Sequence, residues 1–372
     1  MIVADFSTTP LCRREYAYKV GKVLSCNDQI NELAELKIAF PEYKQIHSQI
    51  LQDVLRRLDK AFQSFFGRVQ RKRNGEQLKA GYPRFKARWR YNSFAFPQSG
   101  FKILSNGHIL LSKIGTLRVF MHRKVSGDVK TLTIKRDRVG DWFVVITAEL
   151  PDVKPKQIKT ALGVDVGLKN LVAISSGEYV EPPQLFRKSE KRLKHFQKEL
   201  STKRLGSENR TKARIKLARA HRKIERQRTD FLHKLSRTLI DKADLFIFED
   251  LQIPNMVKNH ALAKSILDAS WNKLIQFTYY KAESAGKRVE LVDPRGTTQK
   301  CSGCGNAVKK SLFERVHRCP NCGLVLDRDF NAALNILAIA RGTREFRPAE
   351  MRPLLVEIPA SHVKEAGSPR LY

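Results

Sequence analysis

The chain has 372 residues, which is enough for two or three domains with a sizeable core. It carries 70 Lys and Arg against 37 Asp and Glu, a formal net charge of +33. Self-repulsion on that scale destabilises a compact protein unless a polyanion neutralises it, so the composition indicates nucleic acid as the partner. An anionic membrane is the alternative. It is disfavoured because no apolar run reaches twenty residues and the basic residues are spread over several segments.

The first part of the chain is predicted to be helical. Polar and apolar residues alternate at helical spacing from Asn27 to Ile38, whereas residues 1–24 show no clear period. From Ile50 to Phe66 apolar residues recur every four positions, which places them in one stripe along a helix. We expect this core-facing helix to end at Gly67.

Residues 68–96 mix cations with aromatic rings. Cations neutralise phosphates and aromatic faces stack on bases, so this segment predicts direct contact with nucleic acid. The alternative is a basic linker whose aromatic residues fill a neighbouring core. The candidate contacts are Arg71, Arg73, Tyr82, Arg84, Lys86, Arg88 and Arg90.

Residues 101–150 alternate with period two and are rich in β-branched and aromatic residues. Asn106-Gly107 and Val139-Gly140-Asp141 are typical hairpin turns. The pattern predicts a small antiparallel barrel or sheet. A polar linker at residues 151–159 indicates a domain boundary.

A new domain is expected to begin near residue 160 with a buried strand that carries Asp165, a turn at Gly167 and a second strand. An Asp inside an apolar strand costs several kcal/mol unless it is paired or bound to metal. The alternative is a structural Asp at a turn. Residues 187–237 then predict a basic helical pair that breaks at Gly206-Ser207. The one-sided charge favours a surface that follows a nucleic-acid backbone, with candidate contacts at Arg222, Arg226 and Arg228.

Residues 244–251 predict a third buried strand that ends at Glu249 and Asp250. A long helix should follow, with Leu267, Trp271, Leu274, Ile275 and Ala282 on one face, and then a strand at residues 288–293. Residues 331–340 predict a helix of small and apolar residues. The Pro-containing tail after Gly342 has no periodicity and is predicted to be disordered.

Two Cys-x-x-Cys pairs, Cys301/Cys304 and Cys319/Cys322, are separated by fourteen residues. Each pair can supply two thiolates from one tight turn, so the spacing predicts a structural zinc ribbon with one Zn²⁺. Two disulfides are the alternative. They are disfavoured because a Cys-x-x-Cys pair rarely closes on itself and the usage of cysteine fits a reducing compartment.

Three acids stand out in the second half: Asp165 on the first strand, Glu249 at the end of a later strand and Asp329 at the start of the last helix. We expect them to converge at one edge of the sheet. Clustered carboxylates repel, and their oxygens are the ligands that Mg²⁺ prefers. They predict a site for two Mg²⁺ ions, with Mn²⁺ as the alternative ion, about 3.5–4 Å apart for phosphodiester hydrolysis. Asp327 and Asp250 remain alternatives for these roles.

Five segments together carry a family resemblance: GVDVGLKNL (163–171), RQRTDFLHKLS (226–236), FEDLQIPNM (248–256), TTQKCSGCG (297–305) and CPNCGLVLDRDFNAALNIL (319–337). They resemble the OrfB/TnpB family of transposon-encoded RNA-guided DNA nucleases, relatives of the type V CRISPR effectors. The resemblance runs from about residue 30 onward. It matches the family's catalytic triad to Asp165, Glu249 and Asp329.

The resemblance implies an α/β RuvC nuclease domain of RNase H-like fold with an inserted four-Cys zinc ribbon, behind an N-terminal β-barrel with a helical insertion. The implied limits are residues 1–100 for a helical recognition region, 101–158 for the barrel or wedge part, 159–299 and 324–341 for the nuclease domain, 300–323 for the ribbon and 342–372 for the tail. Residues 1–26 do not match the family's usual opening, so we expect the first barrel strand to be missing or replaced.

The implied function is RNA-guided, Mg²⁺-dependent cutting of DNA next to a short adjacent motif. The implied partners are a guide RNA from the transposon end, a double-stranded DNA target and a separate transposase of the same element. We expect a monomer or dimer in the prokaryotic cytoplasm, associated with the nucleoid. Base pairing would then choose the sequence while the protein holds the heteroduplex. A nuclease-silent RNA-guided repressor and a protein acting in transposition itself are the alternatives.

Overall fold

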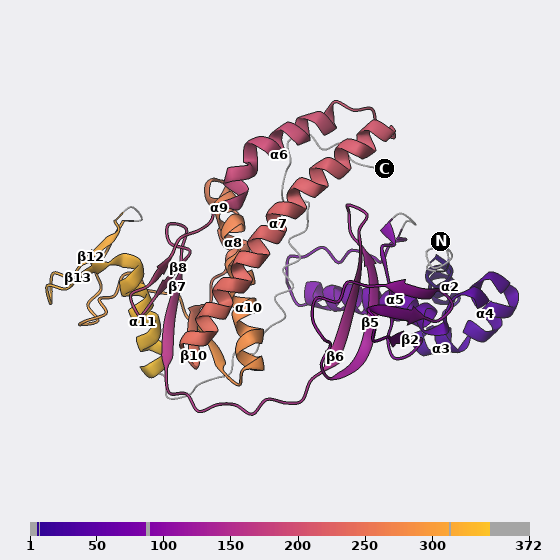
Figure 1. Ribbon diagram of the computed structural model, residues 1–372, viewed down its shortest axis with the longest axis horizontal. Coiled ribbons are helices and arrows are strands. Elements are labelled where there is room, and N and C mark those ends of the chain that lie inside the picture. The colour runs from indigo at the N-terminus through magenta and orange to yellow at the C-terminus, as the bar shows by residue number, and fades with distance from the viewer. Residues whose placement is uncertain (1–5, 7, 87–89, 312–313, 343–372) are drawn as a thin grey trace. The chain divides into compact units, whose positions relative to one another are not determined.

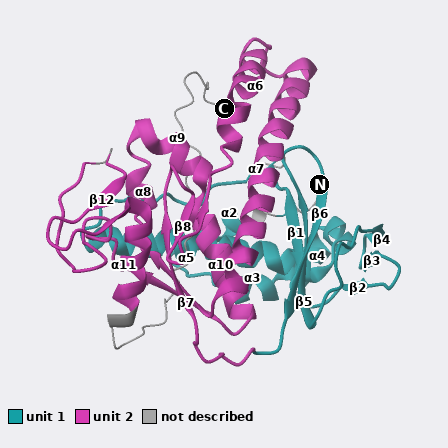
Figure 2. Cartoon of the chain, turned by 60° about the vertical axis from the view of Figure 1, so that its left-hand side comes forward, with its two compact units in different colours: residues 1–152 teal, residues 153–372 magenta. Residues whose placement is uncertain are grey.

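The computed structural model describes residue 6 and residues 8–86, 90–311 and 314–342. The chain divides into two compact units, Met1–Asp152 and Val153–Tyr372 (Figure 2). The division falls at the start of the polar segment 151–159. Each unit is described by itself below. No helix within the described ranges is long and apolar enough to cross a membrane.

Unit 1 begins with short helices. They are α2 (Thr8–Lys19), α3 (Cys26–Asn31), α4 (Leu33–Ala39) and the 3-10 helix η1 (Pro41–Gln45). Helices α3 and α4 confirm the helical spacing of residues 27–38. Helix α2 has no apolar period, and its position depends on long-range contacts: Leu11 is buried, and the side-chain amide of Gln29 donates to the carbonyl of Pro10.

Helix α5 (Ser48–Arg73) is 26 residues long and buries the predicted apolar stripe, including Ile50, Val54 and Phe62. The expected stop at Gly67 is wrong, because the helix continues for six further residues. A glycine in a helix interior costs only about 1 kcal/mol. The helix ends instead at Asn74 and Gly75, where Gly75 has a φ of +90° and its N–H donates to the carbonyl of Lys72.

The strands of unit 1 form two antiparallel sheets. One has the order β1-β5-β6 and the other β2-β3-β4. Their bounds are β1 (Ser93–Phe96), β2 (Phe101–Ile103), β3 (His108–Leu111), β4 (Gly115–Arg118), β5 (Asp128–Arg136) and β6 (Trp142–Glu149). The two predicted hairpins are confirmed, since Asn106-Gly107 joins β2 to β3 and residues 139–141 join β5 to β6.

Both sheets of unit 1 contribute to one core. Phe96 from β1 and Leu132 from β5 pack with Ile109 and Leu111 from β3 and with Ile50 from α5. Strand β1 therefore belongs to the sheet region, although it lies inside the range 1–100 that was expected to be helical. A closed barrel stays a prediction.

Unit 2 is built on a five-stranded sheet of order β11-β10-β7-β8-β9. The bounds are β7 (Ala161–Val166), β8 (Val172–Ile174), β9 (Tyr179–Val180), β10 (Leu245–Glu249) and β11 (Arg288–Val292). Strands β7, β8 and β9 are antiparallel neighbours, whereas β10 runs parallel to both β7 and β11. Parallel pairing of β7 and β10 brings the carboxyl ends of these two strands to the same edge of the sheet.

Helices cover both faces of this sheet (Figure 1). On one face, α7 (Glu208–Lys242) and α10 (Trp271–Ser284) bury residues such as Val164, Phe246 and Phe248. On the other face lies α11 (Arg328–Gly342). A Cβ on Gly163 of β7 would lie only 2.2 Å from the carbonyl oxygen of Ala333, so the absence of a side chain there lets α11 approach the sheet closely.

Helix α6 (Leu185–Ser201) and the first half of α7 form a two-helix arm that extends beyond the sheet (Figure 1). The predicted break at Gly206-Ser207 is confirmed, and the Ser207 hydroxyl caps α7 by accepting from the N–H of Arg210. The arm has its own apolar cluster, which includes Leu193, Phe196, Leu217 and Ile224.

The single long helix expected after Glu249 is in fact three helices. They are α8 (Ile253–Met256), α9 (His260–Ala269) and α10. Ser270 has a φ of +55° between α9 and α10, and this left-handed residue turns the chain. Ile266, Ala269, Trp271 and Leu274 are nevertheless buried in the same core, so the apolar face was predicted better than the continuity of the helix.

Strands β12 (Val316–Arg318) and β13 (Val325–Asp327) form a small antiparallel hairpin just before α11. The expected helix at residues 331–340 is confirmed within α11. The predicted disordered tail, 342–372, lies outside the described residues except for Gly342.

Candidate active site and metal centre

The three predicted acids come together at one edge of the sheet in unit 2. Asp165 lies on β7, Glu249 is the last residue of β10, and Asp329 is in the first turn of α11. Their exposed fractions are 7%, 6% and 6%. The charges of Glu249 and Asp329 both act on Asp165, which confirms that the carboxylates are neighbours.

Asp327 and Asp250 occupy different positions. The Oδ1 of Asp327 accepts from the N–H groups of Asp329 and Phe330, at 2.9 and 3.2 Å, so this carboxylate caps the start of α11. Asp250 is exposed just beyond the end of β10. The structure thus buries Asp165, Glu249 and Asp329 together, whereas Asp327 caps α11.

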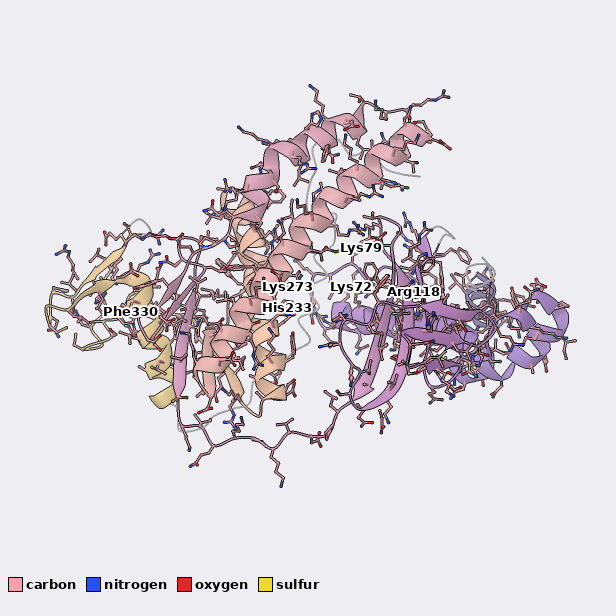
Figure 3. All side chains as sticks on the ribbon, viewed as in Figure 1. Lys72, Lys79, Arg118, His233, Lys273 and Phe330 are labelled. Atoms are coloured by element: carbon pink, nitrogen blue, oxygen red, sulfur yellow. The ribbon has the colours of Figure 1, made fainter. Side chains whose placement is uncertain are left out.

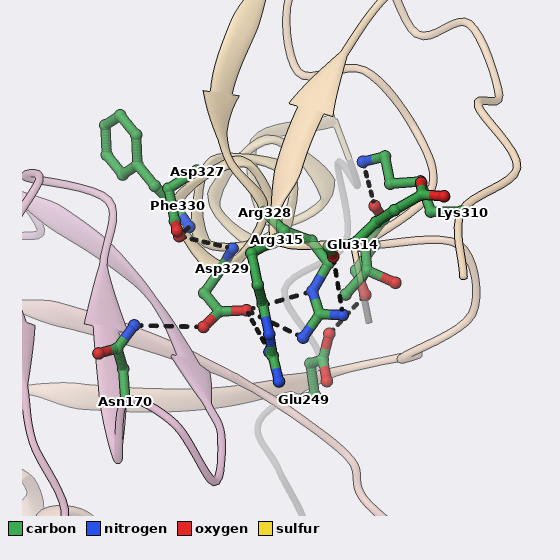
Figure 4. Close-up of polar contacts among 11 residues, drawn as sticks. Asn170, Glu249, Lys310, Glu314, Arg315, Asp327, Arg328, Asp329 and Phe330 are labelled. Atoms are coloured by element: carbon green, nitrogen blue, oxygen red, sulfur yellow. Dashed lines mark hydrogen bonds and ion pairs between the residues drawn. The ribbon is translucent and has the colours of Figure 1, made fainter. Parts of the chain in front are cut away.

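Neighbouring side chains orient two of the carboxylates (Figure 4). The Nδ2 of Asn170 donates to Oδ2 of Asp329 at 3.3 Å, and the Nε and Nη2 of Arg328 donate to its Oδ1, each at 3.3 Å. The Nη1 of Arg315 lies 4.0 Å from the same Oδ1. The hydroxyl of Thr297 donates to Oε1 of Glu249 at 2.5 Å.

The electrostatics of the cluster favour a bound cation. Burial, followed by the charges of Glu249 and Asp329, raises the pKa of Asp165 well above its usual value. Burial also raises the pKa of Glu249, against the lowering effect of the Thr297 hydroxyl. Negative charge is therefore poorly balanced at this edge of the sheet. A set of carboxylate oxygens with that property fits Mg²⁺ or Mn²⁺.

The four predicted cysteines form a second potential metal centre. Cys301, Cys304, Cys319 and Cys322 place their Sγ atoms within 4.8 Å of one another. The closest approaches join the two pairs, with 3.6 Å from Cys301 to Cys322 and 3.5 Å from Cys304 to Cys319. These are too long for disulfides, which need about 2.05 Å. Four thiolates at this spacing fit a tetrahedral Zn²⁺.

Local backbone geometry shapes each pair of cysteines. Gly305 and Gly323 follow the second cysteine of each pair with φ values of +76° and +74°. Their N–H groups donate back to the carbonyls of Cys301 and Cys319. Hydrogen bonds from the backbone of Asn306 and the side chain of Asn321 lower the pKa of Cys304 to about 6, which favours the thiolate that a metal requires.

The segment 301–322, which carries the four cysteines, is called the four-cysteine module here, and two side-chain amides attach it to α11. The Nδ2 of Asn331 donates to the carbonyl of Lys300, and its Oδ1 accepts from the N–H of Ser302. The Nδ2 of Asn335 donates to the carbonyls of both Thr297 and Lys300. The module is thereby fixed to the helix that carries Asp329.

Several of these side chains were missed from the sequence. They are Asn170, Thr297, Arg315, Arg328, Asn331 and Asn335. All but Arg315 lie within the segments that carry the family resemblance. Their place inside those segments was the available signal, but the pattern alone did not tell which group would touch which carboxylate.

The predicted nucleic-acid contacts in unit 1 have different environments. Tyr82 is 47% exposed and packs edge-on against Phe62 and Phe65. Arg71 pairs with Glu76, and the amine of Lys86 lies over the ring of Tyr91. Arg73, Arg84 and Arg90 are exposed, as are Lys72 and Lys79 (Figure 3), whereas Arg88 lies outside the described residues.

The contacts predicted on α7 also differ. Arg226 is exposed, and Arg222 is partly buried. The Nη2 of Arg228 instead donates to Oδ1 of Asp268 at 2.7 Å, in an ion pair whose acid side chain is only 7% exposed. Asp268 also accepts from the N–H of Phe186, so Arg228 helps to hold α6, α7 and α9 together.

The α6–α7 arm is strongly basic. Between residues 185 and 228 there are 17 Lys and Arg against 4 Asp and Glu. A groove of about 730 Å³ between the two helices is lined by cations, including Arg192, Lys212 and Lys216, and by Phe196. Arg192 and Lys216 both lie over the Phe196 ring, which holds their charges in place.

Comparison with known proteins gives the class. The family model OrfB_IS605, described as a probable transposase, matches residues 144–260. The model of the Cas12f1-like TNB domain matches residues 271–336. A solved chain in a Cas12f1–sgRNA–target DNA complex has a TM-score of 0.55 over 90% of this chain and 80% of that chain, at 15% identity, so its likeness is one of fold.

Two relatives define the family. A putative RNA-guided DNA endonuclease of Streptomyces pristinaespiralis is 36% identical over 300 residues, covering 79% of this chain and 72% of the relative. The putative RNA-guided DNA endonuclease InsQ of Escherichia coli strain K12 is 33% identical over 312 residues, covering 79% and 75%. The chain belongs to the OrfB/TnpB family, as its motifs predicted.

Proposed function

We propose that this protein is an RNA-guided DNA endonuclease in which Asp165, Glu249 and Asp329 bind divalent cations for phosphodiester hydrolysis. The observation that carries the proposal is the convergence of these three buried carboxylates from β7, β10 and α11. The names of the relatives, which describe RNA-guided DNA endonucleases, support the choice of substrate.

The order of the strands supports a RuvC nuclease domain of RNase H-like fold. Three antiparallel strands, β7, β8 and β9, continue into β10 and β11, which run parallel to β7. One acid lies on the first strand, one at the end of β10, and one on the helix behind the sheet. Function still follows from the site, because one fold can host unrelated chemistries.

The residues of the site would have separate tasks in hydrolysis. When bound, Mg²⁺ supplies an activated water and stabilises the leaving oxygen. Asp165, Glu249 and Asp329 would hold the cations. The Thr297 hydroxyl and the Asn170 amide would keep Glu249 and Asp329 in the orientations seen here, as groups behind metal ligands commonly do.

The basic arm would hold the nucleic acids. The 17 cations of residues 185–228 offer many phosphate contacts without base selectivity, which suits a protein that delegates sequence choice to a guide RNA. In unit 1, the exposed cations Lys72, Arg73, Lys79, Arg84 and Arg90 and the aromatic edge of Tyr82 would provide a separate contact surface for nucleic acid. We assign the Zn²⁺ of the four-cysteine module a structural task, since four thiolates leave no open position.

The experiment is cleavage of a plasmid library with a randomised flank beside one target. The protein is co-expressed with RNA from the end of its own element, with and without Mg²⁺, and Asp165→Ala is the control. We expect loss of plasmids that carry one flank motif, dependent on guide and Mg²⁺ and absent with Asp165→Ala. The variant should still bind RNA, because the substitution leaves the basic surfaces unchanged.

Three outcomes would contradict the proposal. Cutting that survives in Asp165→Ala would remove the assigned active site. Guide-dependent binding without cutting would instead favour a nuclease-silent repressor, and joined strands would favour transposition by strand transfer.

A further inference from the structure

The charge balance of the acidic cluster is uneven. Of its three buried carboxylates, only Asp329 forms ion pairs within the described ranges, with Arg328 at 3.3 Å and Arg315 at 4.0 Å. Asp165 and Glu249 are equally buried but form no ion pair in those ranges, although the charge of Arg328 also acts on Asp165. Two protein cations, both beside Asp329, therefore serve a cluster built from three acids, and Arg328 is the nearer of the two.

Arg328 is held firmly in this position (Figure 4). It is the first residue of α11, and its N–H donates to the carbonyl of Arg315 at 2.7 Å. Its Nη1 donates to the carbonyl of Glu314, while Nε and Nη2 face Oδ1 of Asp329. The side chain is 16% exposed. The carbonyls of Arg315 and Glu314 thus hold the arginine at its backbone and at its guanidinium.

Both oxygens of Asp329 are consequently engaged by the protein. Arg328 occupies Oδ1, and the amide of Asn170 occupies Oδ2. Oδ1 accepts from two N–H groups of Arg328, so a divalent cation can take this oxygen only by displacing the guanidinium, whereas Oδ2 has the single donor Asn170 and keeps a lone pair. The guanidinium is the donor that a cation would also repel, because both carry positive charge.

We propose that Arg328 is a built-in counter-cation that orients Asp329 while no metal is bound, and that it competes with an incoming divalent cation for Oδ1. This inference rests on the metal site of the proposed function. Arg328 acts through Asp329, so it is a positioning residue. Its charge stabilises the metal-free site and lowers the affinity of that site for Mg²⁺.

The competition makes stability and metal affinity move in opposite directions. Arg328→Gln removes the charge and leaves an amide of similar reach. Without added divalent cation, the variant should unfold at a lower temperature than the parent, because the buried cluster then keeps only the more distant Arg315 as a counter-charge. The same loss should let Mg²⁺ bind at a roughly tenfold lower concentration, since a repelling charge beside the ligand is gone.

The test is thermal unfolding of the full zinc-loaded chain against Mg²⁺ concentration, in the absence of nucleic acid and chelator. Arg328→Lys keeps a cation and should retain a half-saturating Mg²⁺ concentration close to that of the parent. Arg318→Gln is the matched control. It removes an exposed arginine from β12, close to Arg328 in the sequence, and should change neither the melting temperature nor the half-saturating Mg²⁺ concentration.

A lower half-saturating concentration and a larger Mg²⁺-induced rise in melting temperature for Arg328→Gln would support the inference. An equal loss of stability at every Mg²⁺ concentration would overturn it, because a purely structural arginine gives that result. If Arg328→Gln folds only with Mg²⁺, the inference is supported; if Mg²⁺ does not rescue it, the inference fails.

The outcome is separable from that of the proposed function. A shift of the Mg²⁺ midpoint in a protein that cuts no DNA would keep the counter-cation and remove the nuclease. Guide-dependent cleavage with no shift of the Mg²⁺ midpoint would keep the nuclease and remove the counter-cation.

Discussion

The hydroxyl of Thr297 donates to Oε1 of Glu249 across 48 residues of sequence, and both groups are buried. The carbonyl of the same threonine accepts from the amide of Asn335 on α11. Thr297 therefore connects the end of β10 to the helix that carries Asp329. It precedes the four-cysteine module by only four residues, so the orientation of Glu249 depends on the chain that leads into that module.

Thr297→Val should reduce DNA cleavage roughly 10- to 100-fold while the fold persists, because it removes the orienting hydroxyl but keeps the shape. The measurement is the single-turnover cleavage rate with guide RNA at saturating Mg²⁺. Thr298→Val is the control, since the group of Thr298 that Lys310 contacts is its backbone carbonyl. Equal rates in Thr297→Val and the parent would show that the hydroxyl does not matter to the chemistry.

The metal-free protein should lose stability as pH rises. An unfolded Asp titrates near pH 3.9, about the usual value, and burial raises the folded pKa of Asp165 well above its usual value. The folded state therefore binds this proton more tightly, and the free energy of unfolding should fall as pH rises through the folded pKa. Glu249, whose pKa burial also raises, should add to the slope.

Asp165→Asn should flatten that pH profile, because it removes the titrating group with little change of shape. The measurement is urea unfolding from about pH 5 to pH 8 without added Mg²⁺, comparing the two proteins at each pH. Parallel profiles would mean that Asp165 is not the source of the slope.

Cys304→Ser should reduce bound zinc from about one ion per chain towards none, since one of four thiolates is lost. Elemental analysis of the purified protein measures this directly. Cys12→Ser is the control, because Cys12 is an exposed free cysteine of α2. A zinc content that stays unchanged in Cys304→Ser would contradict the four-cysteine site.

Substitution of two arginines that lie two residues apart on α7 should have different effects on stability. Arg228→Gln leaves the buried Asp268 without its cation and should lower the free energy of unfolding by about 3 kcal/mol. Arg226→Gln removes an exposed charge and should leave stability unchanged. If Arg226 contacts a phosphate, its loss should reduce the slope of log affinity for RNA against log salt by about one. Equal stabilities of the two variants would contradict this division.

The four-cysteine cluster and the convergence of the three acids were the most predictable part of the molecule. The four cysteines lie next to one another in two short turns, so spacing alone fixes their geometry. The acids were predictable because an Asp in an apolar strand is unusual enough to notice. The order of strands and helices then implied where Asp165, Glu249 and Asp329 would meet. Their roles remain proposals until variants are measured.

Predictions from local sequence were wrong about where helices end and about which arginines are paired. Gly67 suggested a stop, but α5 continues past it to Arg73, and the turn is made by Gly75. Ser270 gave no breaking signal, yet its left-handed backbone divides the expected long helix into α9 and α10. Arg228 has the same sequence context as Arg226, and only the buried Asp268, forty residues away, distinguishes them.

The close approach at Gly163 joins parts of the chain that the ribosome makes at very different times. Strand β7 emerges early in unit 2, whereas α11, which packs directly on it, is made 170 residues later. A nascent chain can already contain Asp165 and Glu249, but it has no Asp329 until synthesis has passed the four cysteines. No incomplete copy of the protein that stops before α11 can therefore assemble all three carboxylates, so the proposed active site forms only after that last helix has docked.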